Sequence, residues 1–337
     1  MTVLLPGFLD AHVHLALIHP AGLAAGGIGR VLDLGGWTPA DDPAGKEPES
    51  LPETRFAGQF LGAPDGYPSR QAWAPAGSSC PVASPAEAAI AVARQVAVGS
   101  SLIKVTLNSA AGPVLAPDTL AAIVVAAHAR MLPVAAHAEG PGQAAAALDA
   151  GVDLLAHTPF SEALPDALLG AMAGRMTWIS TLDIHGWGEP TAAFSVASDN
   201  LARFHAVGGR VLYGTDLGNG PLPVGLNRRE IEALLACGLS PDDVLAALTA
   251  DFPCRPVGAS VAMSSGDMAS GAAVSGTAAS VDRPAPAGTV TVVPGDRPTD
   301  PHDLAGFTDW LLAAHAQPAH ALPAYALTRP DLEDLRP

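Results

Sequence analysis

Short apolar runs alternate with Ala- and Leu-rich stretches along roughly the first 250 residues. The apolar runs have the length of buried strands, and the stretches between them have the length of helices. Some of these helices open with strong start signals, at Ser84-Pro85-Ala86-Glu87, Pro117-Asp118 and Ser240-Pro241-Asp242-Asp243. The pattern predicts eight strands: Gly7–His14, Gly29–Leu34, Arg55–Leu61, Leu102–Leu107, Leu132–His137, Val152–His157, Met176–Leu182 and Arg210–Gly214.

Strands that alternate with helices are typical of a parallel sheet, and eight such units favour closure into a (β/α)8 TIM barrel. An open, doubly wound sheet is the alternative. No glycine-rich phosphate-binding sequence lies between the first strand and its helix, which disfavours a dinucleotide-binding version of that alternative. The predicted fold class is therefore α/β, with the barrel as its architecture.

The sequence changes character after about residue 256, which predicts a barrel domain over residues 1–255 and an appendage over residues 256–337. Residues 258–287 are mostly Ala, Ser, Gly and Pro and predict a flexible linker, because they offer little apolar surface to bury. A strand is predicted at Gly288–Val293, and an amphipathic helix at Asp303–His315. The last residues are expected to form a Pro-rich tail.

The net charge of the chain limits the kinds of molecule that it is expected to bind. The 337 residues include 17 Lys and Arg but 33 Asp and Glu, a net charge of -16, which disfavours nucleic acids and anionic membrane surfaces. No apolar run reaches the ~20 residues of a membrane span, and the N-terminus has no signal-peptide pattern. Cys80, Cys237 and Cys254 form no disulfide framework, as expected of a cytoplasmic protein.

Several predicted strands end in a residue that can bind a metal. His12 and His14 lie two apart on the first strand, so both imidazoles point to the same side. His137 ends the fifth strand, His157 ends the sixth, and Asp216 follows the eighth. The active site of a barrel gathers where the strands end, so the pattern predicts that these five side chains converge.

Lys104 is unusual in composition and in position. Only Lys46 and Lys104 are lysines among the 17 basic residues, and Lys104 lies in the fourth strand, which is otherwise apolar. A buried ammonium is costly, so burial calls for a partner or a modification, unless the side chain extends to solvent. A lysine amine can take up carbon dioxide and become a carbamate that bridges two cations, which arginine cannot do. Lys46, in a Pro- and Glu-rich loop, is expected to be dispensable.

Three segments around these residues match a known pattern: Leu5-Pro6-Gly7-Phe8-Leu9-Asp10-Ala11-His12-Val13-His14, Val134-Ala135-Ala136-His137-Ala138 with the following Ala147–His157, and Gly214-Thr215-Asp216. Together they resemble the metal-dependent amidohydrolase superfamily, in particular its imidazolonepropionase and dipeptidase-like branch. The resemblance covers residues 5 to about 252. It implies a hydrolase on a barrel and does not specify a substrate.

The resemblance also implies a binuclear site. His12, His14 and Asp216 would hold one divalent cation, His137 and His157 a second, and carboxylated Lys104 would bridge the two. Zinc suits these ligands, and Mn²⁺, Fe²⁺ or Co²⁺ would also fit. Two cations would acidify a bridging water to hydroxide and polarise the scissile carbonyl, and Asp216 would move the proton to the leaving group.

The ends of the chain depart from this branch, whose members usually carry a small β-sandwich beside the barrel. Only Met1–Leu4 precede the first barrel motif, and Gly288–Gly295 resembles a remnant of the sandwich's C-terminal half. We therefore expect a reduced or missing sandwich, which leaves it open whether the protein forms a homo-oligomer. The sixth strand ends in His157-Thr158, where the branch usually has a His-Gly pair.

Substrate contacts are expected from the loops after the strands. Tyr67 and Arg70 follow the third strand and could bind a carbonyl and a carboxylate. His185 follows the seventh strand and could line the pocket, and Glu139 could orient His137. The sequence thus predicts a hydrolase that acts on an amide, lactam or related C–N bond of a small molecule. Ester or phosphoester hydrolysis, decarboxylation, ring hydration or a catalytically silent metal-binding barrel are the alternatives.

Overall fold

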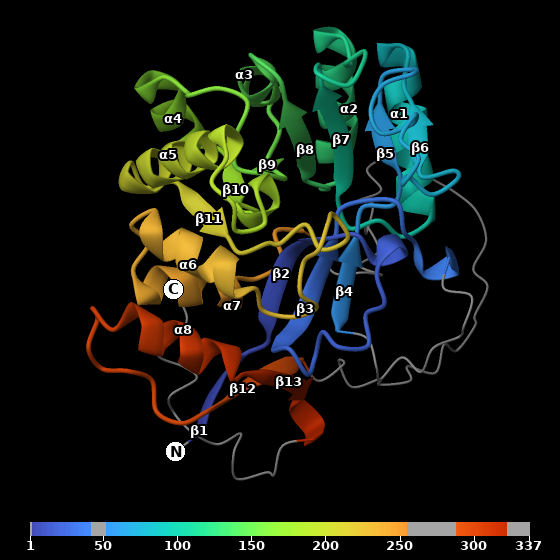
Figure 1. Ribbon diagram of the computed structural model, residues 1–337. Helices are drawn as coiled ribbons and strands as arrows, with labels where there is room; N and C mark the ends of the chain where they lie inside the picture. Colours follow the sequence, from blue (N-terminus) through green and yellow to red (C-terminus); the bar gives the residue numbers. More distant parts are fainter. Residues whose placement is uncertain (1, 42–51, 255–287, 322–337) are drawn as a thin grey trace, which may run out of the picture.

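The computed structural model describes residues 2–41, 52–254 and 288–321, and its centre consists of two parallel sheets (Figure 1). The smaller sheet has the order β2-β3-β4 and the larger has the order β11-β10-β9-β8-β7-β5-β6. The strands are β2 (Phe8–Val13), β3 (Ile28–Asp33), β4 (Glu53–Phe56), β5 (Phe60–Gly62), β6 (Ser79–Pro81), β7 (Ile103–Asn108), β8 (Val134–Glu139), β9 (Leu154–Leu155), β10 (Thr177–Ile179) and β11 (Arg210–Leu212).

From β6 onward an α-helix follows each strand of the larger sheet, as expected of a barrel, whereas only short 3-10 segments, Leu15–Leu17 and Pro39–Asp41, follow β2 and β3 in the described residues. At α7 the predicted start signal is confirmed and forms a capping box, in which the Ser240 hydroxyl and the Asp243 carboxylate each accept a hydrogen bond from the other residue's backbone N–H. At α1 the Ser84 side chain accepts no hydrogen bond from the backbone N–H groups of the first helical turn. The Glu87 carboxylate instead accepts one from the backbone N–H of Ala83. The helices are α1 (Pro85–Ala97), α2 (Pro117–His128), α3 (Gln143–Asp149), α4 (Asp166–Ala173), α5 (Ala192–Ala206), α6 (Arg228–Ala236) and α7 (Pro241–Thr249).

A few backbone hydrogen bonds join the two sheets. Between β2 and the chain that follows β11, Ala11 N donates to Tyr213 O at 2.9 Å, Asp216 N to His12 O at 2.8 Å and His14 N to Leu217 O at 2.8 Å. Beside β4, Ser101 N, just before β7, donates to Phe56 O at 2.9 Å. The strands therefore follow one another round a (β/α) barrel, as predicted, although no continuous ladder closes it.

The predicted third strand is two strands in the structure, which corrects the sequence interpretation. β4 ends at Phe56, β5 begins at Phe60, and the two belong to different sheets. Between them Gly58 has a φ of +79°, and a Cβ there would lie 2.5 Å from Oε1 of Gln95. This glycine lets the chain turn where a side chain would not fit. The short strand β6 was not predicted.

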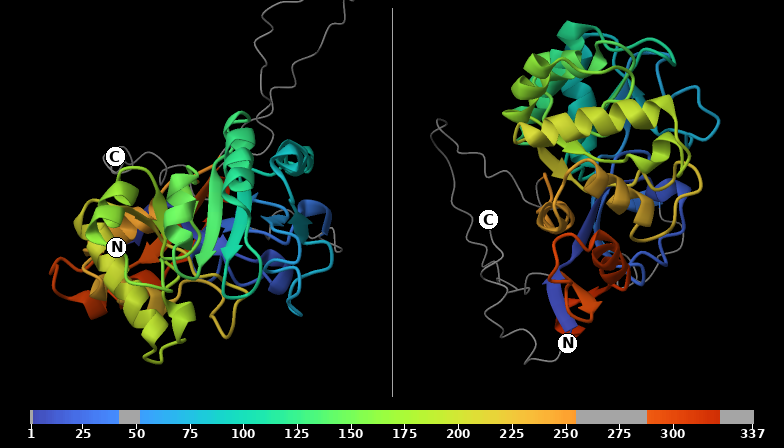
Figure 2. Two further views of the ribbon diagram at one scale, coloured as in Figure 1. Left: turned by 90° about the horizontal axis from the view of Figure 1, so that it is seen from above. Right: turned by 60° about the vertical axis from the view of Figure 1, so that its left-hand side comes forward.

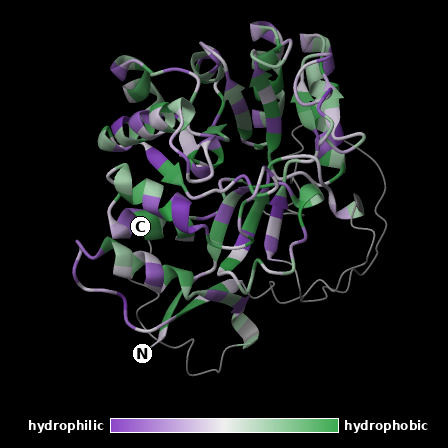
Figure 3. Ribbon diagram, viewed as in Figure 1, coloured by the Kyte–Doolittle hydropathy of each residue, from purple (hydrophilic) through white to green (hydrophobic). Residues whose placement is uncertain are grey.

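One buried apolar cluster takes a residue from most of the parallel strands, as expected of a barrel interior. A second, larger cluster lies between the strands and the helices, and Figure 3 shows hydrophobic residues running along the strands. The interior cluster contains Leu9, Ala11, Leu32, Leu34, Ala57, Leu102, Ala135, Leu154, Ala156, Ile179 and Leu212.

A three-stranded antiparallel sheet lies at one end of the molecule (Figure 2). Its members are β1 (Thr2–Pro6), β12 (Thr289–Pro294) and β13 (His315–Pro318), and α8 (Leu304–Leu312) lies beside it. The strand and the helix predicted for the appendage are thus confirmed in the described residues. The Phe8 N–H donates to Oγ1 of Thr291 at 2.8 Å, which fastens this sheet to β2.

Three predictions fall on residues outside the described part of the chain: the linker at 258–287, the Pro-rich tail and Lys46. Within the described part, no helix is long and apolar enough to cross a membrane.

Candidate metal centre

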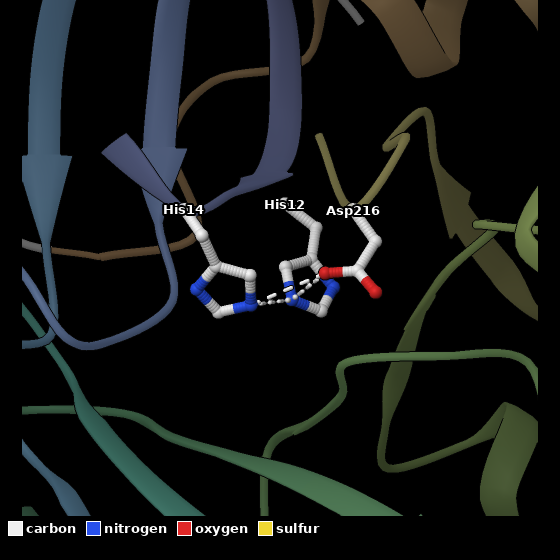
Figure 4. A group of neighbouring side chains, drawn as sticks. All are labelled: His12, His14 and Asp216. Carbon is white, nitrogen blue, oxygen red and sulfur yellow. Dashed lines mark hydrogen bonds and ion pairs between the residues drawn. The ribbon is translucent and has the colours of Figure 1, made fainter. Parts of the chain in front are cut away.

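His12 and His14 come from the carboxyl end of β2 and direct their rings to one point (Figure 4). Their Nε2 atoms lie 3.3 Å apart, and both residues are buried. His12 Nδ1 lies 2.8 Å from the carbonyl oxygen of Ala156, and His14 Nδ1 lies 2.9 Å from that of Gly35. A carbonyl oxygen only accepts, so each Nδ1 carries the proton and each Nε2 presents a lone pair to the common point.

Asp216 completes this group from the loop after β11. Its Oδ1 lies 3.1 Å from Nε2 of His12 and 3.1 Å from Nε2 of His14, and it is buried without a hydrogen-bond donor. Its backbone φ of +58° is unusual for a residue with a side chain and places the carboxylate beside the imidazoles. The other oxygen, Oδ2, accepts a hydrogen bond from Asn219 Nδ2 at 2.9 Å.

The three ligand atoms fit a divalent cation. All lie within 4.8 Å of one another, and three acceptor atoms in a buried space repel one another unless a proton or a cation lies between them. Burial lowers the pKa of His12, whereas the pKa of His14 rises despite burial because the neighbouring Asp216 carboxylate stabilises its charged form. Burial also disfavours the Asp216 carboxylate, but His12 and His14 lower its pKa well below the usual value. A proton and a cation therefore compete for this position.

His137 and His157 lie next to this group, from the ends of β8 and β9. The ring centroids of His12 and His157 are 4.7 Å apart, and those of His137 and His157 are 4.9 Å apart. His157 Nδ1 lies 2.9 Å from Thr181 Oγ1, and His137 Nε2 lies 3.1 Å from Glu139 Oε2. One nitrogen of each ring is thus oriented by a neighbour, and the other remains to bind a cation.

Lys104 of β7 is only 2% exposed and lines the same cavity as these four histidines. Burial lowers the pKa of its amine to about 7, although Asp216 and Asp33 oppose the shift. A substantial fraction of this amine is therefore neutral near pH 7, and the neutral amine is the form that reacts with carbon dioxide. The structure thus brings together all six residues predicted as metal ligands.

The cavity over these residues has a volume of about 250 Å³. Tyr67 and His185, predicted as substrate contacts, both line it; the Tyr67 ring stacks on His137 at 4.8 Å, and the His185 ring packs on Phe160 at 4.2 Å. Arg70 does not join them. Its side chain is 69% exposed and pairs with Asp65 at 2.9 Å, outside this cavity.

Two buried carboxylates support the site without facing the cavity. Asp10 accepts hydrogen bonds from the hydroxyl of Thr215 at 2.6 Å and from the backbone N–H of His12 at 3.1 Å. The bond with Thr215 connects β2 to the loop that carries Asp216. Asp33 accepts from the backbone N–H groups of Leu15 and Gly35. Burial raises the pKa of Asp10 to about 7 and that of Asp33 to about 6.

The sequence reasoning missed Asp10, Asn219 and two tryptophans of the cavity, Trp73 and Trp187. Asp10 carried a usable signal, because it lies two residues before His12 on the same face of a strand. Asn219 and the tryptophans lie in loops, where no periodicity marks the side chains that turn toward the site.

Comparison with known proteins places this geometry in context. The model of the amidohydrolase family matches residues 3–251. A direct search of curated protein sequences finds no match.

Three solved structures share the fold with low identity. The A. niger ochratoxinase has 21% identity and a TM-score of 0.59, over 74% of this chain and 71% of its own. A Xaa-Pro dipeptidase with bound methionine in its active site has 17% identity and a TM-score of 0.62, over 91% of this chain and 84% of its own. A bottromycin amidohydrolase has 20% identity and a TM-score of 0.56, over 73% of this chain and 66% of its own.

Proposed function

Because the chain belongs to the amidohydrolase family, we propose that it is a metal-dependent hydrolase that cleaves an amide, lactam or related C–N bond of a small molecule. One observation carries the proposal. The Nε2 lone pairs of His12 and His14 and the unpartnered Oδ1 of Asp216 meet within 3.3 Å of one another at a buried point. Only a proton or a cation stabilises such an arrangement.

The assignment of ligands follows the two groups of side chains. His12, His14 and Asp216 would hold one divalent cation, and His137 and His157 a second, with the carbamate of Lys104 between the two. Imidazole and carboxylate ligands suit Zn²⁺, and Mn²⁺, Fe²⁺ or Co²⁺ would also fit. Cations bound here would supply an acidified water as nucleophile and a Lewis acid for the scissile carbonyl.

The protein's own groups would position the substrate and move the proton. Asp216 takes a proton from the attacking water and returns it to the leaving nitrogen, so that water and amide become acid and amine. Asn219 holds Oδ2 of Asp216 and so keeps the carboxylate facing the imidazoles. The Tyr67 hydroxyl would donate to a substrate oxygen, because burial raises the pKa of this phenol and keeps it protonated.

The same proposal divides the chain by role. All the candidate ligands lie within residues 1–255, and the described part of residues 256–337 supplies β12, β13 and α8. Since β12 binds the start of β2, the appendage would stabilise the strand that carries His12 and His14.

Metal content and turnover test this function. The purified protein should contain about two divalent cations per chain by elemental mass spectrometry, and chelator dialysis should abolish amide hydrolysis until metal is restored. The double variant His12→Ala/His14→Ala should lose metal and activity, whereas His302→Ala, at an exposed residue outside the site, should keep both. A protein that binds metal but hydrolyses no amide or lactam of a broad panel would contradict the proposal.

A further inference from the structure

The cavity has a strongly aromatic wall beyond the candidate ligands. Its larger apolar side chains are those of Phe60, Tyr67, Trp73, Phe160, Ile184 and Trp187. Aromatic residues make up only 5% of the chain, so five of them around one cavity of about 250 Å³ are a marked concentration. Such a lining binds flat, apolar groups well.

Two of these residues also reach solvent. Trp73 is 40% exposed and Trp187 is 43% exposed, although both line the cavity. Trp73 lies in the loop after β5, and Trp187 follows β10; in the sheet β7, β8 and β9 separate these two strands. The two indoles therefore reach the outer part of the cavity from different sides of the barrel.

Trp187 is held in a costly conformation. Its φ of +50° is a genuine outlier for so bulky a residue. Its backbone N–H donates a hydrogen bond to the backbone carbonyl of Asp183 at 2.7 Å. The indole lies against Gly220, where a Cβ would approach it to 2.5 Å. Strain of this kind persists only where the surroundings enforce it, and it is concentrated at binding and active sites.

Trp73 is supported by other aromatic rings. Its ring lies 6.4 Å from that of Phe60, nearly perpendicular to it at 86°, and 6.0 Å from that of Tyr67. Both spacings are in the range of favourable aromatic pairs. The ring is thus held in place on one side and open to solvent on the other.

The charges around the cavity disfavour an anionic outer end of the substrate. The Glu139 carboxylate lines the cavity and accepts a hydrogen bond from Asn108 at 2.6 Å. The cation of the nearby loop, Arg70, is paired with Asp65 outside the cavity. Among the described residues that line the cavity there is no arginine, so a free carboxylate on the substrate would face the Glu139 anion without a guanidinium to pair with.

We propose that the substrate carries an uncharged aromatic ring, which the indoles of Trp73 and Trp187 contact while its amide lies at the histidines. This inference rests on the proposed function for the position of the amide. The ring itself is selected by the two indoles, independently of the bond that is cleaved.

The test compares small amides that differ in one feature. N-phenylacetylglycinamide and N-acetylphenylalaninamide carry the ring on opposite sides of the amide, N-acetylglycinamide lacks it, and N-phenylacetylglycine adds a carboxylate. Released amine gives kcat/KM. The better ring-bearing carboxamide should exceed N-acetylglycinamide by at least about tenfold, and N-phenylacetylglycine should be cleaved about tenfold less well than its carboxamide.

Variants attribute the preference to the indoles. Trp73→Ala and Trp187→Ala should each lower the ratio of ring-bearing to ring-free kcat/KM about three- to tenfold, mainly through KM. Ile90→Ala is the matched control, because Ile90 is 56% exposed on α1 and does not line the cavity. It should leave the ratio unchanged.

The outcomes separate the two proposals. Hydrolysis without a preference for the ring, or with a preference that both tryptophan variants retain, overturns the aromatic inference and leaves the proposed function standing. Without hydrolysis of these four amides, the broad panel of amides and lactams decides the proposed function, and binding decides the aromatic inference. Saturable quenching of tryptophan fluorescence by N-phenylacetylglycinamide, weakened about threefold or more in Trp73→Ala, supports the inference. Absence of quenching overturns it.

Discussion

Asn219 Nδ2 lies 2.9 Å from Oδ2 of Asp216, so that one carboxylate oxygen is engaged by an amide and the other faces His12 and His14. The two residues are three apart in the same loop, and Asn219 also lines the cavity. The hydrogen bond fixes the rotation of the carboxylate, which a short side chain in a loop would otherwise sample freely.

Replacing Asn219 should therefore weaken the metal site without removing a ligand. We expect Asn219→Ala to lower metal affinity or kcat about 10- to 100-fold, the range found for residues that orient ligands. Competition with a chromophoric chelator measures the affinity, and circular dichroism checks the fold. Wild-type affinity and wild-type kcat together in this variant would show that Asp216 needs no such support.

Lys104 should control the second cation. In Lys104→Ala we expect the metal content to fall from about two per chain to one or less and hydrolysis to be lost, because no bridging carboxylate can form. Labelling the wild type with ¹³C-bicarbonate should give a carbamate signal that is absent from the variant. Full metal content with undiminished hydrolysis in the variant would refute the bridge.

Glu139 should affect one cation position more than the other. Its carboxylate accepts from His137 and from Asn108, so Glu139→Ala releases His137 while His12, His14 and Asp216 keep their partners. We expect one of the two cations to bind about tenfold more weakly and the other to be unchanged, as seen in a two-step metal titration. Glu189→Ala, at an exposed position, should leave both steps as they are. Equal weakening of both steps would argue against separate sites.

Glu230 should make a contribution to stability that is lost as the pH rises. This residue is fully buried, and burial raises the pKa of its carboxyl from 4.5 to about 7. The folded state thus holds this proton more tightly than the unfolded state, so its contribution is complete below about pH 4.5 and is lost as the pH rises through about 7.

The shift corresponds to about 3 kcal/mol at most in the free energy of unfolding. The free energy of unfolding of metal-free protein, measured with urea at pH 5 and pH 8, should change less unfavourably with rising pH in Glu230→Gln than in the wild type. Asp10 and Asp33, whose pKa values are also raised, would retain their share in both proteins. An identical pH dependence in the two proteins would exclude Glu230 as a cause.

Local patterns in the sequence were enough to predict the strands that carry the candidate ligands. His12-Val13-His14 and Val134–His137 combine a buried strand with a polar end, and both lie at the carboxyl ends of parallel strands in the structure. The break at Gly58 was not predicted, because the reason for it is a contact with Gln95, far along the chain. Periodicity does not report such contacts.

The sequence did not show which loop side chains turn into the cavity. Tyr67 and Arg70 are three apart in one loop, yet one stacks on His137 and the other pairs with Asp65 outside the cavity. The difference depends on backbone turns and on tertiary contacts, such as the hydrogen bond from Thr106 Oγ1 to the carbonyl of Tyr67 at 2.7 Å. Trp187 was missed for the same reason, since its position depends on Gly220.

The bond between Phe8 and Thr291 joins residues 283 positions apart, and the one between Thr215 and Asp10 joins residues 205 apart. On the ribosome, His12 and His14 are therefore synthesised long before Asp216. The strand β12, whose Thr291 accepts the hydrogen bond from Phe8 of β2, is synthesised later still. A nascent chain would present two histidines without their carboxylate, so it would bind metal weakly until late in synthesis. Binding of a first cation by these three candidate ligands would thus depend on completion of the fold.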